Sequence, residues 1–170
     1  MCSKKSSIVL TPAVNSAKKA KIEFLIHHYE HNNAHSSSYG LEAAEKLAVE
    51  PERVFKTLVI KLDSSQLVVA ILPVNSMLSM KIVAKACGGR KAEMADKVEV
   101  QRSTGYVLGG VSPIGQKKSL KTVIDNSAQQ YATIYVSGGR RGLELELSAL
   151  DLQSMTLALF APISQLVSLQ

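Results

Sequence analysis

Short strand-like and helix-like segments follow one another irregularly along this chain, and this order limits the folds that it can adopt. Residues 143–147 show the strict alternation of apolar and polar side chains that is typical of a half-buried strand. Residues 66–72 are more fully apolar, which predicts a central strand. Because no regular βαβ repeat is present, the pattern favours a mixed or antiparallel sheet wrapped by helices. The other predicted strands are 23–30, 55–62, 122–125 and 133–136.

Three helix starts are marked by residues whose side chains commonly cap helices. Thr11 precedes a proline, and Ser79 precedes an apolar helical stretch that two glycines end. Ser148 is followed three residues later by Asp151, as in a capping box. The predicted helices are 12–19, 41–47, 79–87, 91–97 and one that begins at 148, with a further helical turn at 51–54.

The composition predicts one domain, residues 11–170, preceded by a flexible polar arm, residues 1–10. The 170 residues are 46% apolar, which is enough for a packed core, and the two cysteines, Cys2 and Cys87, favour a reducing, cytoplasmic setting. No apolar run approaches the roughly 20 residues that a membrane helix needs. The net charge of +6 suits a polyanionic partner without demanding one.

The stretch Gly109–Ser119, GGVSPIGQKKS, nearly matches a phosphate-binding loop. Two of its glycines have the required separation, but Gln116 stands where the motif needs a lysine. Pro113 also removes an N–H group from the middle, and a strand is predicted next instead of a helix. We therefore reject nucleotide binding. Two alternatives remain: a plain turn, or a bend whose bare backbone approaches a ligand and directs N–H groups at a developing oxyanion.

The four histidines of the chain, His27, His28, His31 and His35, fall within nine residues and form a candidate metal site. On one continuous helix, His27, His31 and His35 would share a face and could ligate zinc. This segment reads largely as strand, however, and no set of cysteine or acidic ligands stands nearby. We therefore expect ordinary polar or edge histidines, and neither a metal nor another cofactor.

Lys56 heads an otherwise apolar row of its predicted strand, with Leu58 and Ile60 on the same face. In one interpretation the lysine sits at the strand end and reaches water along its aliphatic stem. In the other, its ammonium lies at the mouth of a pocket and holds a phosphate or carbonyl oxygen. The residues alone leave both interpretations open.

The remaining charged residues have simple interpretations as solvated side chains. Glu144 and Glu146 are expected on the solvent side of their strand. The basic pairs 117–118 and 140–141 would form a rim for a nucleic-acid backbone if they converge in space. Only 5% of residues are aromatic and tryptophan is absent, which disfavours a stacking platform for single strands.

Six motifs are spread from Thr11 to about Ile163: TPAV at 11–14, HHYEH at 27–31, VFKTLVI at 54–60, KAEMAD at 91–96, QRSTGYVLGGVSPIGQKK at 101–118 and ATIYVSGGRRGLELEL at 132–147. Together they resemble the YbaK family of bacterial aminoacyl-tRNA deacylases, which is similar to the editing domain of bacterial prolyl-tRNA synthetases. The resemblance covers nearly the whole chain, and the 101–118 motif is highly specific. It implies that family's fold, with a largely antiparallel, curled central sheet flanked by helices.

The resemblance also implies roles for individual residues. Lys56 would hold the aminoacyl or terminal-adenosine end of the substrate, and the G-x-x-x-P loop of Gly109 and Pro113 would face the scissile ester with its backbone. The implied catalytic residues are Lys56, Gly109 and Gly110. Glu144 stands where relatives often carry aspartate. This difference keeps the negative charge but makes the side chain one methylene longer. The implied substrate-binding residues are Tyr29, Pro113, Ser137 and Glu144, and the candidates for the tRNA backbone are Lys117, Lys118, Arg140 and Arg141.

The implied activity is cleavage of mischarged Cys-tRNA(Pro), and also of Cys-tRNA(Cys), by attack of the substrate's own thiolate on its carbonyl. Release of a cyclic thioester would make the enzyme formally a lyase, and attack by water a hydrolase. The chain shows no Ser-His-Asp or Cys-His constellation, which agrees with a nucleophile supplied by the substrate. The resemblance implies two partners, the mischarged tRNA and prolyl-tRNA synthetase, and no association with a membrane. Two alternatives remain: a deacylase for another mischarged tRNA, such as Ala-tRNA(Pro), or a non-catalytic module that binds tRNA or a synthetase.

Overall fold

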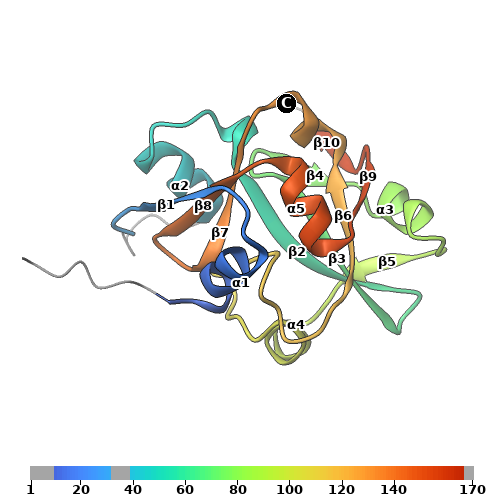
Figure 1. Ribbon diagram of the computed structural model, residues 1–170. Coiled ribbons are helices and arrows are strands. Elements are labelled where there is room, and N and C mark those ends of the chain that lie inside the picture. Colours follow the sequence, from blue (N-terminus) through green and yellow to red (C-terminus); the bar gives the residue numbers. More distant parts are fainter. Residues whose placement is uncertain (1–9, 32–38, 167–170) are drawn as a thin grey trace, which may run out of the picture.

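The computed structural model describes residues 10–31 and 39–166, and a five-stranded mixed sheet runs through it (Figure 1). Its strand order is β5-β2-β3-β6-β9. Strands β5 and β3 lie antiparallel to β2, whereas β6 runs parallel to both β3 and β9. The predicted strands are confirmed here, and β3 occupies the centre as expected. The bounds are β2 Phe55–Leu62, β3 Gln66–Pro73, β5 Ala92–Met94, β6 Lys121–Asp125 and β9 Leu159–Ala161.

Two smaller antiparallel sheets complete the strand arrangement. One has the order β1-β8-β7 and the other pairs β10 with β4. A bridge between Val54 and Tyr135 joins the start of β2 to β7. The mixed α/β fold with largely antiparallel pairing is therefore confirmed, but no sheet is strongly curled, because the strands divide among separate sheets. The bounds are β1 Phe24–His28, β4 Ser76–Leu78, β7 Ile134–Arg140, β8 Leu143–Leu147 and β10 Ser164–Leu166.

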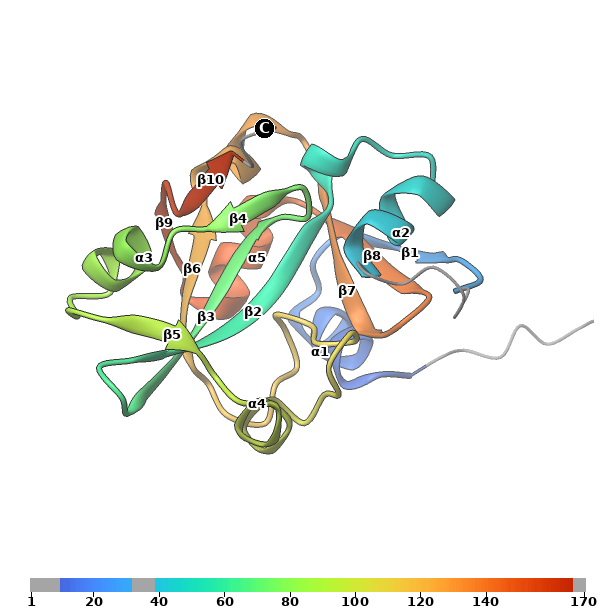
Figure 2. The same cartoon turned by 180° about the vertical axis from the view of Figure 1, so that it is seen from behind.

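Both faces of the five-stranded sheet are covered by apolar side chains. Val69 and Ile71 of β3 pack into a cluster with α1, α5 and the β1-β8-β7 sheet, whereas Val68 and Ala70 pack into a second cluster with α3. Alternate residues of a strand point to opposite faces, so a strand that is buried on both sides must be apolar throughout. This explains the continuous apolar run of β3. Figures 1 and 2 show α1 and α5 on one side of the sheet and α3 on the other.

The predicted capping residues begin their helices. Thr11 Oγ1 accepts a hydrogen bond from the N–H of Val14 at 3.2 Å, and Ser148 Oγ accepts one from Asp151 at 3.1 Å. Ser79 caps α3 in the same way. Within the described ranges, no helix is long and apolar enough to cross a membrane. The bounds are α1 Pro12–Ala20, α2 Tyr39–Lys46, α3 Met80–Ala86, α4 Lys97–Thr104 and α5 Ala149–Thr156, with short 3₁₀ helices at Pro51–Arg53 and Asn126–Gln130.

The predicted helix at 91–97 is wrong. Residues 92–94 form β5, which pairs with the end of β2, and the helix begins after them because Asp96 caps it at the N–H of Glu99. The two glycines 138–139 lie inside β7, at a register shift. Residues 1–9 of the predicted arm 1–10 lie outside the described residues, as do residues 32–38.

Candidate active site

A hollow of about 250 Å³, here called the Lys56 hollow, gathers residues from distant parts of the chain. Lys56 of β2, Ser137 of β7 and Glu144 of β8 line it. Tyr29, just after β1, and Gly109, in the loop after α4, complete this group. The helix α2 and the strands β2 and β7, which contribute lining residues, can be followed in Figure 2. The hollow thus unites five residues that the sequence had assigned to the site, whereas Gly110 and Pro113 do not line it.

Lys56 is the second residue of β2 and is half-buried. Its Nζ donates a hydrogen bond to the carbonyl oxygen of Ser76 at 2.6 Å, and burial lowers the pKa of the ammonium. A lysine at a strand end that only extended into water would not require this hydrogen bond and would not be half-buried. The geometry therefore fits the pocket interpretation, and a partly desolvated ammonium is suited to bind a carbonyl or anionic oxygen.

Glu144 is the most unusual group in the Lys56 hollow. Only 7% of the residue is exposed, and burial raises the pKa of its carboxyl to about 8. Its Oε2 is buried and has no hydrogen-bond partner among the described residues. A buried carboxylate without a partner is costly, so such an atom in a pocket is a strong candidate for contact with a ligand.

The expectation that Glu144 and Glu146 face solvent is wrong. The leucines of β8 fill the core on one side, but on the other side Glu144 is buried at the Lys56 hollow. Glu146 bonds to His27 at 2.9 Å and to Thr133. Alternation shows that a strand has two different faces, but it does not show whether the polar face is wet.

Three hydroxyl groups add polar character to the Lys56 hollow. Thr57 Oγ1 is buried without a hydrogen-bond partner among the described residues, and sequence reasoning missed it because threonine is common in strands. Ser137 lies opposite Glu144 in the β7–β8 register, and its Oγ accepts a bond from the N–H of Gly139. Burial, and then the nearby Glu144, raise the pKa of the Tyr29 phenol, which keeps its proton at neutral pH.

The glycine bend lines the hollow and also packs closely against its neighbours. A Cβ on Gly109, whose φ is +90°, would lie 3.0 Å from the Tyr39 ring, and one on Gly110 would lie 2.8 Å from Cα of Arg140. The N–H of Gly110 donates to the carbonyl of Val107 at 3.0 Å, which closes a turn. Among the described residues, the N–H groups of Gly109 and Val111 have no acceptor. The bend is therefore a turn that leaves two N–H groups available beside the pocket.

The two basic pairs lie in different places. Lys117 and Lys118 border a separate hollow with the buried Pro113, beside α1 and α5. Arg140 and Arg141 border another hollow next to β1. Since they do not share a cavity, the conditional expectation of one converged basic rim is not met.

The histidines that the structure describes differ in their surroundings: Nδ1 of His31, for example, is buried without a hydrogen-bond partner among the described residues. His27 Nε2 is hydrogen-bonded to Oε1 of Glu146, and the His27 ring lies 5.2 Å from the ring of Tyr135. In residues 10–31 and 39–166 no group of three or more possible ligands could hold a metal ion. His35 lies outside these ranges.

The fold and the Lys56 hollow define a small ligand-binding α/β domain, in which an ammonium and a buried carboxyl face one cavity. The aminoacyl-tRNA editing domain model matches residues 32–155, and the chain belongs to this family. It is 37% identical, over 95% of its length and 97% of the relative, to EbsC of Enterococcus faecalis (strain ATCC 700802 / V583), provisionally named a Cys-tRNA(Pro)/Cys-tRNA(Cys) deacylase.

Two further likenesses support this assignment. Half of the chain is 28% identical to 15% of the proline–tRNA ligase of Brachyspira hyodysenteriae (strain ATCC 49526 / WA1). The fold matches a crystal structure provisionally described as a trans-editing enzyme for prolyl-tRNA synthetase, with a TM-score of 0.78 and 20% identity over 92% of this chain and 99% of that one. The resemblance inferred from the sequence motifs is thereby confirmed at the level of the family.

Proposed function

We propose that this protein is a deacylase that cleaves mischarged Cys-tRNA(Pro), and also Cys-tRNA(Cys), in trans. Membership of the editing family supports the reaction class, and the name of EbsC supports the cysteinyl group. Cysteine is close to proline in size, and a packing difference of about one methylene provides only about 1–3 kcal/mol of discrimination in a synthetase pocket. A second site that removes the wrong amino acid corrects the remaining errors.

The observation that carries this proposal is the joint presence of Lys56 and Glu144 in one small hollow. A cysteinyl ester presents an α-ammonium at one end and carbonyl and ester oxygens at the other. A bound α-ammonium would favour the ionised form of Glu144 and would give the resulting carboxylate a charged partner. The Lys56 ammonium would bind the oxygens at the opposite end and so orient the ester.

In the proposed reaction the thiolate sulfur of the substrate attacks its own carbonyl carbon. A C–S bond forms, the bond from that carbon to the ribose oxygen breaks, and the proton lost by the thiol ends on the ribose hydroxyl. The products are free tRNA and a cyclic thioester, so the step is formally that of a lyase. The N–H groups of Gly109 and Val111 would stabilise the developing oxyanion, because the N–H of Gly110 is already bonded.

The experiment that tests this function compares Cys-tRNA(Pro) with 2-aminobutyryl-tRNA(Pro), which has nearly the same size but no thiol. We expect the cysteinyl ester to be cleaved at least 100-fold faster. Equal rates would refute attack by the substrate thiol and favour water as nucleophile. Preference for Ala-tRNA(Pro) would refute the cysteinyl assignment. If no ester is cleaved, the protein is not a deacylase, and the alternative of a non-catalytic binding module is favoured.

Selection of tRNA(Pro) is proposed to come from a complex with prolyl-tRNA synthetase. The support is the family's link to synthetase editing in the two relatives described above. We expect the isolated protein to cleave Cys-tRNA(Pro) and Cys-tRNA(Cys) at similar rates. Added synthetase should favour Cys-tRNA(Pro), and a ratio of rates that stays constant with synthetase present would contradict this partnership.

A further inference from the structure

A second, more open hollow of about 380 Å³ adjoins the Lys56 hollow and contains two arginines. Tyr29 lines both hollows, so they lie next to each other. We propose, resting on the proposed function, that this arginine hollow binds the phosphate that joins the terminal nucleoside of the tRNA to the preceding nucleotide. Its lining residues are His28, Tyr29, Glu30, Arg140, Arg141 and Gly142.

Two close backbone contacts place the arginine hollow directly beside the Lys56 hollow, where the ester would bind. A Cβ on Gly110 would lie 2.8 Å from Cα of Arg140, so the bend that lines the Lys56 hollow touches the β7–β8 turn directly. On the other side, a Cβ on Gly142 would lie 2.7 Å from the carbonyl oxygen of Tyr29. The first phosphate of a charged tRNA lies within one nucleotide of the ester. A phosphate site must therefore adjoin the ester site, and this hollow does.

The two arginines have different surroundings. Arg140 is exposed and free to form bidentate hydrogen bonds with phosphate oxygens. The guanidinium of Arg141 lies 3.9 Å from the centre of the Tyr39 ring, and its Nη2 is 3.6 Å from a carboxylate oxygen of Glu42. Its Nε and Nη2 are buried without a hydrogen-bond partner among the described residues. Arg141 is thus held in place and adds positive charge, while Arg140 makes the direct contact.

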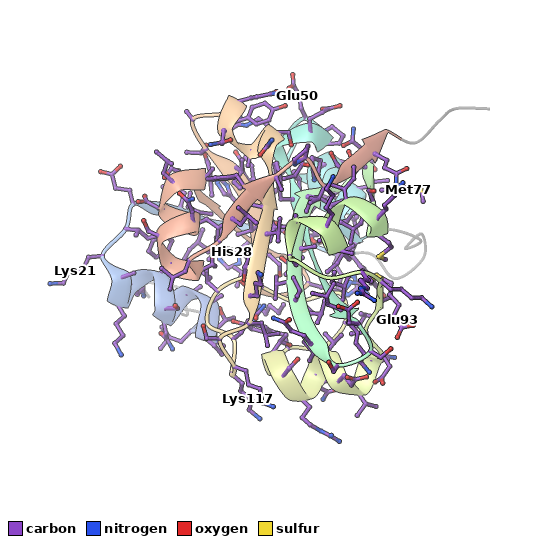
Figure 3. All side chains as sticks on the ribbon, turned by 90° about the vertical axis from the view of Figure 1, so that its right-hand side faces the viewer. Lys21, His28, Glu50, Met77, Glu93 and Lys117 are labelled. Carbon is purple, nitrogen blue, oxygen red and sulfur yellow. The ribbon has the colours of Figure 1, made fainter. Side chains whose placement is uncertain are left out.

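Arg140 gives the arginine hollow a guanidinium group that no carboxylate pairs with among the described residues. Glu30 is the one acidic residue that lines the hollow, and Arg141 is the arginine that Glu42 pairs with. The other basic pair borders a different hollow, and Figure 3 shows Lys117 at the lower end of the molecule, well apart from His28. The arginine pair can therefore reach the phosphate nearest to the ester, whereas the lysine pair cannot.

The test measures binding and cleavage separately. An uncharged RNA hairpin with a CCA end gives a Kd that does not depend on catalysis. Cysteinyl-adenosine, which carries the ester but no phosphate, reports the ester site alone. The variants are Arg140→Ala and Arg140→Lys, and the matched control is the double variant Lys117→Ala/Lys118→Ala.

We expect Arg140→Ala to weaken hairpin binding about tenfold at low salt and to flatten its salt dependence by about one released counterion. Arg140→Lys should keep part of the affinity for the hairpin. Both Arg140 variants should cleave cysteinyl-adenosine at a rate within twofold of wild type. The proposal fails if hairpin binding is unchanged in Arg140→Ala, if the lysine control loses more affinity, or if wild type does not bind the hairpin. Hairpin binding that depends on Arg140 without cleavage of any ester would overturn the proposed function and leave the phosphate site standing.

Discussion

Replacement of Glu144 by glutamine should stabilise the fold at neutral pH. Burial raises the pKa of this carboxyl from 4.5 to about 8, so at pH 7 it stays protonated in the folded protein but is ionised in the unfolded chain. The 2.5 pH units between 4.5 and 7, at about 1.4 kcal/mol per unit, correspond to a penalty of about 3 kcal/mol. Because the folded pKa is raised, this penalty is absent below pH 4.5, grows as the pH rises, and levels off above about 8.

The measurement is urea unfolding of wild type and Glu144→Gln at pH 4 and pH 7. We expect the variant to gain about 3 kcal/mol at pH 7 relative to its difference at pH 4. The same variant should lose deacylase activity, since an amide is a poor partner for an ammonium. A stability difference that does not change between the two pH values would refute the burial argument.

Glu146→Gln provides a matched control in the same strand. Burial alone would raise the pKa of Glu146, but hydrogen bonds from Thr133, His27 and Tyr135 outweigh it, so the pKa is lowered. A lowered carboxyl pKa stabilises the fold above the unfolded value near 4.5, and this contribution disappears as the pH falls through the folded pKa. Glu146→Gln should therefore destabilise the protein at pH 7 and lose this effect in acid, which is the opposite sign to Glu144→Gln.

Three further predictions follow from single contacts. Cys87→Ala should leave the deacylation rate largely intact and cost about 1 kcal/mol in urea unfolding, because the buried Cys87 does not line the Lys56 hollow; loss of turnover with the fold preserved would contradict the thiol mechanism. Thr11→Ala should cost about 1–2 kcal/mol, since Thr11 caps α1 and also donates a bond to Gly138, and an unchanged unfolding midpoint would contradict it. Gly115→Ala should cost more than about 2 kcal/mol, because φ is +70° and the new Cβ would lie 2.5 Å from the Pro12 backbone; a wild-type melting temperature would contradict this contact.

Local signals in the sequence predicted most elements of the fold. Strands β2 and β3 carry branched apolar residues in unbroken runs, and the caps at Thr11, Ser79 and Ser148 were confirmed, because each depends on neighbouring residues. Residues 92–94 were not predicted as a strand, because that strand exists only through pairing with residues 60–62 of β2, far earlier in the sequence. Such long-range pairing produces no recognisable sequence pattern in so short a segment.

The site was predictable only in part. Lys56, Tyr29 and Ser137 were assigned through the resemblance, and the structure gathers them in one hollow. The burial of Glu144 could not be predicted, because the residues that line the hollow with it, such as Tyr39 and Lys56, are distant in sequence and no pattern within β8 reports them. Thr57 gave no sequence signal, since its only distinction is a buried hydroxyl without a partner among the described residues.

The most direct test of the central claim is the rate at which Lys56→Ala cleaves purified Cys-tRNA(Pro). Lys61→Ala is the control, because Lys61 lies in the same strand and pairs with Glu99 away from the hollow. We predict a loss of at least 100-fold in kcat/KM for Lys56→Ala, with near wild-type values for the control. Similar activity of both variants would show that the Lys56 hollow is not where the ester is cleaved.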